Sequence, residues 1–360
     1  MALSKIQSNS YEDTAVHGQR NLIINGACVI DQRNGGSAIT SSGYVVDRFH
    51  YQNDSDATLS LQQSSTVPDN FTKSISVTVS TADASVGAAQ YSMMTQRIEG
   101  YNIANLGWGT SAAKAVTLSF YVRSSVTGTF GGVLNNSDSS RSYPFTYSIS
   151  SADTWEKKTI TIEGDTSGTW NTTNSSGIQL RWAFGMGSTY AGTAGSWSGN
   201  SYFGASGAVD LISTVNATWY ITGVQLELGD TATTFEHRSF GDELAKCQRY
   251  YRHFQSDDSS FMPFFGGMCI AGTIAGYVIP MIPKMRSVPT LETSGTASHY
   301  EVLHGGTSVT CSAVPAIDGQ SELDVLDLRA TVSSGLTVGD GCYLRASNTT
   351  NAYLALDAEL

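Results

Sequence analysis

Charged residues are scarce in this chain. They make up 14% of its 360 residues, against about 25% in a typical soluble domain. Serine, threonine, asparagine and 36 glycines take their place, while aromatic residues still reach 10%. Disordered chains are rich in charge and poor in aromatic residues, so this composition does not indicate disorder. It is typical of an all-β chain with many turns and polar, uncharged faces.

Basic stripes and long apolar runs are also missing. The net charge is −11 and no basic stripe occurs, which argues against nucleic acid and anionic membrane surfaces as partners. No apolar run reaches the length of a membrane span, and the amino terminus "MALSKIQSNSYEDTA" lacks the apolar core of a signal peptide. We therefore expect a protein that is made in a cytoplasm and is neither inserted in a membrane nor secreted through a signal peptide.

The cysteines are few, odd in number and widely spaced. They are Cys28, Cys247, Cys269, Cys311 and Cys342. No CxxC pair occurs, so a zinc site is not expected, and we predict buried free thiols. The sequence has no cluster of histidines and no acidic loop such as DxDxD. We therefore expect no metal and no cofactor.

Most of the chain alternates apolar and polar residues. Residues 1–20 are polar without a sustained period, and we interpret them as an attachment arm. Residues 21–236 read as about ten strands separated by Gly, Asn and Ser turns. This pattern predicts a two-sheet sandwich, most simply a jelly roll. The expected strands are residues 20–30, 43–52, 57–65, 73–82, 91–100, 114–125, 143–150, 155–164, 177–187 and 217–229.

The period changes abruptly after residue 236, without a turn-rich linker. Leu244, Cys247 and Tyr251 recur at helical spacing, and Ser239 and Asp242 suit the N-cap. We predict a linking helix over 237–254, whose apolar stripe needs a partner because short isolated helices are marginal in water. Residues 255–360 return to strand patterns and predict a second, smaller β domain.

Several blocks resemble tail-fibre and receptor-binding proteins of tailed bacteriophages. They are "RNLIINGA" (20–27), "GYVVDRF" (43–49), the block ending "ITIEGDTSGTW" (155–170), "ATWYITGVQLELGDTATTFEHRSFGDELAKCQRYY" (217–251) and "MRSVPT" (285–290). The resemblance implies a trimeric attachment protein whose jelly roll is similar to carbohydrate-binding modules. It also implies that Leu244, Cys247 and Tyr251 contact other copies around a three-fold axis.

The segment 181–207 is the expected glycan site, because it places aromatic rings among Gly and Ser. Flat rings cover the apolar faces of sugars, while polar side chains bond their hydroxyls. We predict that Trp197 and Tyr202 stack on a glycan, with Tyr190, Trp170 and Asp165 beside them. The alternatives are that the rings pack over the sandwich or against a neighbouring subunit, and that Asp165 bonds its own turn.

These observations together predict a virion structural protein that is not an enzyme. We expect a homotrimeric tail fibre that joins another virion protein through residues 1–20 and attaches to a host surface polysaccharide or protein. The alternative is a head fibre, decoration or adaptor protein with contacts only inside the virion. A polysaccharide-cleaving tailspike is less favoured, because Asp210, Glu227 and Asp324 show no spacing that marks a catalytic pair and no β-helix repeat occurs.

Overall fold

The computed structural model describes residues 20–256 and 260–360. The chain divides into two compact units, Met1–Glu243 with Leu360, and Leu244–Glu359. Apart from Arg20, the arm predicted over residues 1–20 lies outside the described residues. Within the described ranges, no helix has the length and apolar character that a membrane crossing requires.

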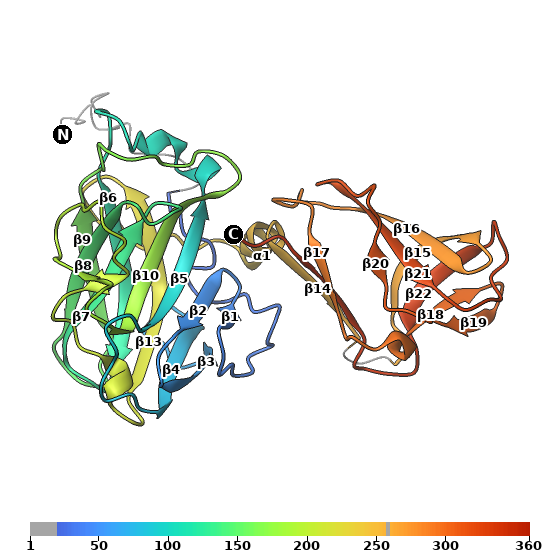
Figure 1. The fold of residues 1–360 in the computed structure, drawn as a ribbon, viewed down its shortest axis with the longest axis horizontal. Coiled ribbons are helices and arrows are strands. Elements are labelled where there is room, and N and C mark those ends of the chain that lie inside the picture. The colour runs from blue at the N-terminus through green and yellow to red at the C-terminus, as the bar shows by residue number, and fades with distance from the viewer. Residues whose placement is uncertain (1–19, 257–259) are drawn as a thin grey trace, which may run out of the picture. The chain divides into compact units, whose positions relative to one another are not determined.

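The first unit is a sandwich of two antiparallel sheets (Figure 1). One sheet has six strands, in the order β1 (Gly43–Val46), β2 (Phe49–Asn53), β5 (Tyr91–Glu99), β10 (Ser176–Met186), β7 (Gly128–Asn135) and β8 (Ser142–Ile149). The other has five, in the order β3 (Thr58–Ser64), β4 (Ser74–Thr81), β13 (Thr218–Leu228), β6 (Val116–Ser124) and β9 (Glu156–Ile162). Two short parallel strands, β11 (Ala191–Gly192) and β12 (Gly204–Ala205), and three 3-10 helices, η2 (Gly100–Asn102), η3 (Ala104–Leu106) and η4 (Leu211–Ser213), complete it.

The sandwich core follows from strand alternation. In β6, Phe120 and Val122 are fully buried, and in β10 so are Leu180 and Trp182. They belong to one cluster between the two sheets, and each large side chain so buried stabilises the fold by about 1.5–3 kcal/mol. The chain changes sheet between β2 and β3, β4 and β5, β5 and β6, β6 and β7, β8 and β9, β9 and β10, and again on the way from β10 to β13. The predicted fold class, an all-β jelly-roll sandwich, is confirmed.

The start of the sandwich differs from the prediction. Residues 20–30, expected as a strand, form turns instead. Asn25 and Cys28 have φ values of 61° and 57°, and the Asn25 side chain donates to the carbonyl of Ile30 and accepts from its amide. These local bonds compete with a sheet ladder. The single strand expected over 43–52 is a tight hairpin of β1 and β2, turned at Arg48 with φ 72°.

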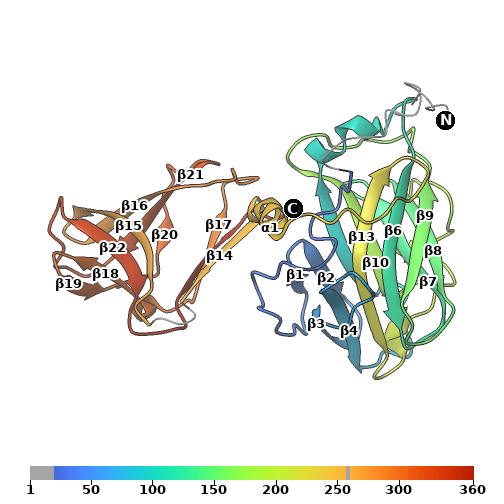
Figure 2. The same cartoon turned by 180° about the vertical axis from the view of Figure 1, so that it is seen from behind.

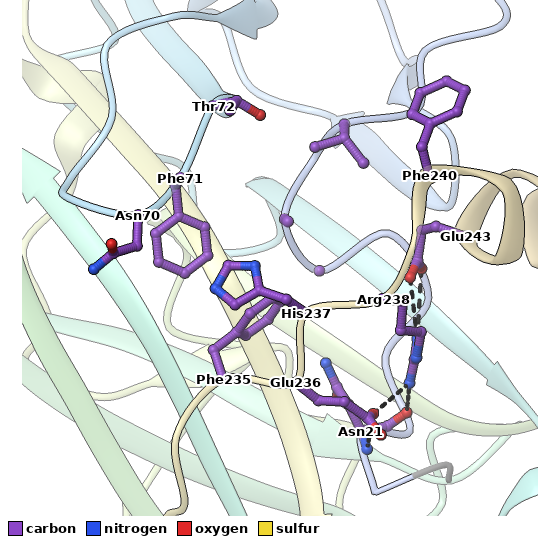
Figure 3. A pocket seen from close by; sticks show the side chains of 13 residues that line it. Asn21, Asn70, Phe71, Thr72, Phe235, Glu236, His237, Arg238, Phe240 and Glu243 are labelled. Atoms are coloured by element: carbon purple, nitrogen blue, oxygen red, sulfur yellow. Dashed lines mark hydrogen bonds and ion pairs between the residues drawn. The ribbon is translucent and has the colours of Figure 1, made fainter.

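A clamp of side chains holds together the two places where the described chain enters and leaves the sandwich. We define the clamp as Asn21, Glu236, Arg238 and Glu243 (Figure 3). The Glu236 carboxylate accepts from the backbone amide of Asn21 at 2.9 Å and pairs with Arg238 at 3.0 Å. Arg238 also donates to the Ile23 carbonyl at 3.0 Å and pairs with Glu243. The clamp fixes the chain after β13. This explains why no turn-rich linker separates β13 from the helical pattern that follows.

The predicted linking helix over 237–254 is too long. The helix α1 is Phe240–Gln248, and it begins after Ser239, whose hydroxyl accepts from the Asp242 amide at 3.2 Å. The predicted N-cap is therefore confirmed. Residues Tyr251–Gln255 form the strand β14, because they pair along β23 (Tyr353–Asp357), and long-range pairing overrides local propensity.

The shorter helix also overturns the predicted apolar stripe of Leu244, Cys247 and Tyr251, which was expected to contact other copies of the chain. Cys247 is fully buried and Tyr251 is 3% exposed within the single chain, while Leu244 is half-buried. Tyr251 lies in a strand, where its hydroxyl donates to Glu292 at 3.3 Å. Leu244, Cys247 and Tyr251 therefore do not form an open helical stripe, and Cys247 and Tyr251 have no surface to offer a partner chain.

The second unit is also built from antiparallel strands (Figure 2). A small sheet contains β14, β23 and β17 (Thr290–Thr293). A larger sheet has the order β19 (Thr307–Thr310), β18 (Tyr300–His304), β22 (Gly341–Ala346), β15 (Pro263–Ala271), β16 (Ile274–Pro280), β21 (Val325–Thr331) and β20 (Ala316–Ile317). A 3-10 helix, η5, spans Ala297–His299.

The second unit buries one face of its large sheet and exposes apolar residues on the other. Cys269, Tyr277 and Leu344 lie in its core, whereas their sequence neighbours Met268, Val278 and Tyr343 are 51%, 71% and 54% exposed. We define the apolar sheet face as Leu303, Met268, Ile270, Val278 and Tyr343, on strands β18, β15, β16 and β22. A face of this kind is unusual on a protein that stays monomeric.

All five cysteines are free and buried, as predicted. Burial raises the pKa of the Cys28 thiol to about 12, and burial also raises the pKa of Cys311 to about 12. Because the thiolate is the reactive form, these side chains are chemically inert while the protein is folded.

Candidate functional site

The predicted residues Trp170 and Trp197 belong to a cluster of four rings at the edge of the sandwich. Trp170 and Trp197 both contact Trp108 edge-on, with ring centroids 4.6 and 5.4 Å away. Tyr143 lies 5.3 Å from Trp197. Trp197 is half-buried and its indole donates to the Glu163 carbonyl at 2.7 Å. These rings pack over the core and against one another, which was the alternative reading of the segment.

Asp165 is closed to a ligand. Its side chain is 2% exposed, and its two carboxylate oxygens accept from Nε and Nη2 of Arg141 at 2.7 and 2.8 Å. One of them also accepts from the Ser167 amide. Such a two-pronged pair leaves little accepting capacity. Asp165 and Trp170, which is 7% exposed, are therefore structural residues, and their prediction as glycan ligands is corrected.

Tyr190 and Tyr202 lie in a different group from the tryptophans. Tyr190 stacks on Phe203 with centroids 4.7 Å apart and planes 13° apart, and Tyr91 meets both rings edge-on at 5.8 Å. Tyr202 is half-buried, and its hydroxyl accepts from the side-chain Nδ2 of Asn200 at 2.9 Å. Among the described residues, no ring contact joins this group to the tryptophans, so the five predicted residues do not converge on one site.

The segment with Tyr190 and Phe203 covers part of the outer face of the six-stranded sheet. Beneath it Arg181, on β10, lies 4.6 Å from the centre of the Phe203 ring. Its guanidinium donates to Asn135, to Gln179 at 2.7 Å and to Ser139. Burial, with the nearby charge of Arg97, lowers the pKa of Arg181 to about 9. This buried cation is held by neutral groups and by a ring.

The uncovered part of that outer face carries a row of planar and polar side chains. Tyr44 and His50 meet edge-on across β1 and β2, with ring centroids 4.7 Å apart. His50 pairs in register with Thr95 on β5, and Thr95 pairs with Arg181 on β10. Strands lie about 4.8 Å apart, so three steps span about 14 Å. That length suits a short stretch of a sugar chain lying across the strands.

Two further side chains flank the row. Thr95 donates to Gln52 on β2 at 3.2 Å, and Arg97 follows Thr95 by two residues on the same face of β5. Arg33 lies 4.2 Å above the Tyr44 ring. We define the aromatic face by the residues Tyr44, His50, Gln52, Thr95 and Arg97. All but Thr95 are half-buried, so each keeps some exposed surface, and Arg97 also donates from Nη1 to the Leu360 carbonyl at 2.7 Å.

A hollow adjoins the same face where β10 ends. Its volume is about 350 Å³, and small residues such as Ala183, Ala205 and Gly207 line it together with Asp210. Asp210 accepts from the Met186 amide at 3.0 Å, and burial, with the nearby charge of Asp83, raises its pKa above the usual range. Ala183 pairs with Met93 on β5, so the hollow continues the outer face beyond the segment that covers Arg181.

Sequence reasoning missed the aromatic face because its members come from two separate segments, the hairpin of β1 and β2 and the strand β5. Tyr44 and His50 stand in the quoted block "GYVVDRF" and just after it, which was interpreted as a strand without a ligand role. Only the register of β2 with β5, and of β5 with β10, brings them beside Thr95 and Arg97. The sequence signal that could have revealed this face was the alternation of polar residues on the outer side of these strands. Among the described residues, no group of three His, Cys, Asp or Glu could hold a metal.

Comparison with known proteins finds similar structures but no similar family model or curated sequence. Sixty chains of solved structures match. One is the enzymatically active domain of tailspike protein 4 of bacteriophage CBA120, at 12% identity and TM-score 0.32, over 58% of this chain. The match spans 21% of that solved chain, about a fifth of its length.

Other similar structures are carbohydrate-binding modules. A structure described as "CBM4 structure and function" matches at 14% identity and TM-score 0.28, over 57% of this chain and 97% of that one. The C-terminal family 22 module of Clostridium thermocellum Xyn10B matches at 9% identity and TM-score 0.29, over 53% of this chain and 94% of that one. At these identities and scores the likenesses leave open what this chain binds.

Proposed function

We propose that the protein is a bacteriophage attachment protein that binds a host surface glycan on the aromatic face of its jelly roll. The observation that carries the proposal is the row from Tyr44 through His50 and Thr95 towards Arg181, fixed by strand register on one sheet face. Rings offer flat apolar surface to the C–H faces of a sugar, and Gln52 and Arg97 offer bonds to its hydroxyls. The resemblance of residues 217–251 to phage fibres supports the biological setting.

We also propose that the protein is part of the virion and that it is not an enzyme. Assembly would occur in the bacterial cytoplasm, with another virion protein bound through residues 1–20. Of the carboxylates considered for catalysis, Glu227 has a structural role, and Glu227 and Asp324 lie in different units. Glu227 is 1% exposed and accepts from both the amide and the hydroxyl of Thr233. Asp324 lies in the other compact unit and is 61% exposed beside Lys284.

A homotrimer forms part of the proposal, and the apolar sheet face supports it. Met268, Val278 and Tyr343 are large, apolar and more than half exposed in the single chain, and adjacent strands carry them on one face. Burying such a face against copies of itself gives a closed oligomer. Three copies of one weak sugar site would raise avidity by about 10²–10⁴ where the geometry allows simultaneous binding.

The apolar sheet face also suits contact with another virion protein, which is the role expected of a head fibre, decoration or adaptor protein.

A glycan array distinguishes glycan binding from a role with contacts only inside the virion. The full chain is applied as wild type and as the double variant Tyr44→Ala, His50→Ala. We expect the wild type to retain particular glycans and the double variant to lose them, with an unchanged melting temperature because both rings lie on the outer face. Failure of the wild type to retain any glycan would contradict the proposed function and favour the virion-internal role.

A further inference from the structure

A second pocket lies at the end of the sandwich, beside the clamp. Its volume is about 250 Å³. Three rings, Phe71, Phe235 and His237, form one wall, and Arg238 with its two carboxylate partners forms another (Figure 3). The pocket is smaller than the usual site for a drug-sized ligand, which is about 300–1,000 Å³. Its size therefore suits a single ring of a ligand.

The aromatic wall is built around a glycine. Phe71 lies 5.2 Å from both Phe235 and His237, and those two rings are 4.9 Å apart. Gly223, at the bulge of β13, has φ 62°, and a Cβ there would stand 2.6 Å from the Phe71 ring. The missing side chain is what lets Phe71 lie against the sheet. His237 is exposed, so the outer ring of the wall faces solvent.

The polar wall contains a donor that lacks an acceptor. The Arg238 side chain is 9% exposed, and its Nη1 and Nη2 are used by the clamp. Its Nε–H, by contrast, is buried and has no hydrogen-bond partner in the described part of the chain. Because it is buried, this N–H is out of reach of a ligand in the pocket, and the accessible polar groups are those of Asn70 and Thr72.

The charges around the pocket select for a neutral ligand. Glu236 and Glu243 outnumber Arg238, so an anion would meet a net negative wall. Burial by itself would raise the pKa of Glu236, but the bond from the Asn21 amide and the charge of Arg238 outweigh it and lower the pKa. Both carboxylates are engaged, by Arg238 and by the amides of Asn21 and Asn25. A cation would therefore find no open carboxylate.

We propose that this pocket binds one ring of a neutral saccharide. The ring would lie with its apolar face against Phe235 and His237. Asn70 and Thr72, both exposed at the rim, supply further groups for hydroxyls. Phe71, Phe235 and the clamp belong to other segments than the aromatic face, so this would be a separate site. It holds or fails independently of the glycan proposed above.

The test uses the His237 imidazole as a local reporter in proton NMR of the full chain. Its ring signals are assigned by their loss in His237→Ala. Glucose, galactose, mannose and N-acetylglucosamine are titrated separately. At least one should shift the His237 signals, and Phe235→Leu, which keeps the reporter, should bind that sugar about two- to tenfold more weakly, as expected for one weakened ring contact. Tyr101→Ala, which removes a ring that is 60% exposed elsewhere in the sandwich, is the matched control and should bind normally.

Two results would overturn the proposal. The first is that no neutral sugar shifts the His237 signals. The second is that a sugar shifts them but Phe235→Leu binds it as wild type does. The Tyr44→Ala, His50→Ala variant should retain the His237 shift, so failure here is distinguishable from failure of the aromatic face.

Discussion

The two units of this chain differ in what they do with the second face of each β-sheet. In the sandwich, two sheets bury their inner faces against each other, and the outer faces carry polar or planar side chains. In the second unit, the large sheet also shows an apolar face to solvent. Of the large hydrophobic residues exposed among the described residues, three lie in the first unit and nine in the second, although the second is the smaller. This contrast supports the two proposed roles, glycan binding for the sandwich and contact with protein for the second unit.

The largest expected effect comes from charging the apolar sheet face. Met268→Asp with Val278→Asp should convert a trimer into monomers, because two charges cannot be buried at a closed interface without partners. Sedimentation at micromolar concentration measures the change. Val215→Asp, at a position 54% exposed in the sandwich, is the control and should leave the trimer intact. A wild-type chain that sediments as a folded monomer would refute the oligomer.

The next effect contrasts one ion pair from each unit. Arg141→Ala should lower the free energy of unfolding of the sandwich by about 3 kcal/mol, because it leaves the buried carboxylate of Asp165 without its partner. Lys284→Ala, which removes the partner of Asp324 at 3.7 Å on the surface of the second unit, should leave the stability unchanged. Chemical denaturation followed by far-ultraviolet circular dichroism measures both, because all six tryptophans lie in the first unit and their fluorescence would not report the second. Equal losses in the two variants would contradict the assignment of Asp165 to the structural edge of the sandwich.

A smaller effect concerns pH and the clamp. The pKa of Glu236 is lowered in the folded protein, so its stabilising contribution is present above the ordinary glutamate pKa and is lost as pH falls through the folded value. Wild type should therefore lose melting temperature on acidification more steeply than Glu236→Gln, below about pH 4.5. Thermal melts at pH 7, 5, 4 and 3 give the two slopes. Parallel slopes would show that the clamp does not depend on the Glu236 charge.

The sandwich was the more predictable region, for a physical reason. Residues 73–82 and 114–125 alternate cleanly, and β4 and β6 lie within them, because one side of each strand faces the core. The strand β7 was missed because Gly131 and Gly132 interrupt its pattern. A Cβ at Gly132 would stand 2.4 Å from the Phe145 ring, so close packing dictates that glycine, and periodicity cannot show it.

The candidate site was less predictable than the fold. Asp165 and its partner Arg141 are 24 residues apart, and nothing local in the sequence pairs them. Tyr190 and Trp197 stand seven positions apart in one Gly-rich segment, yet they join different ring clusters. The aromatic face depends on the register of β2, β5 and β10. Composition marked the right segment for aromatic packing, but only pairing between distant strands determines which rings remain open.

The most direct test of the account is the position of a bound sugar in the first unit. A crystal of the full chain soaked with a glycan retained on the array should show its density on the aromatic face, over Tyr44 and His50, with Gln52 and Arg97 within hydrogen-bonding distance. Density that covers Trp197 or that lies on the apolar sheet face, with the aromatic face empty, would contradict the account.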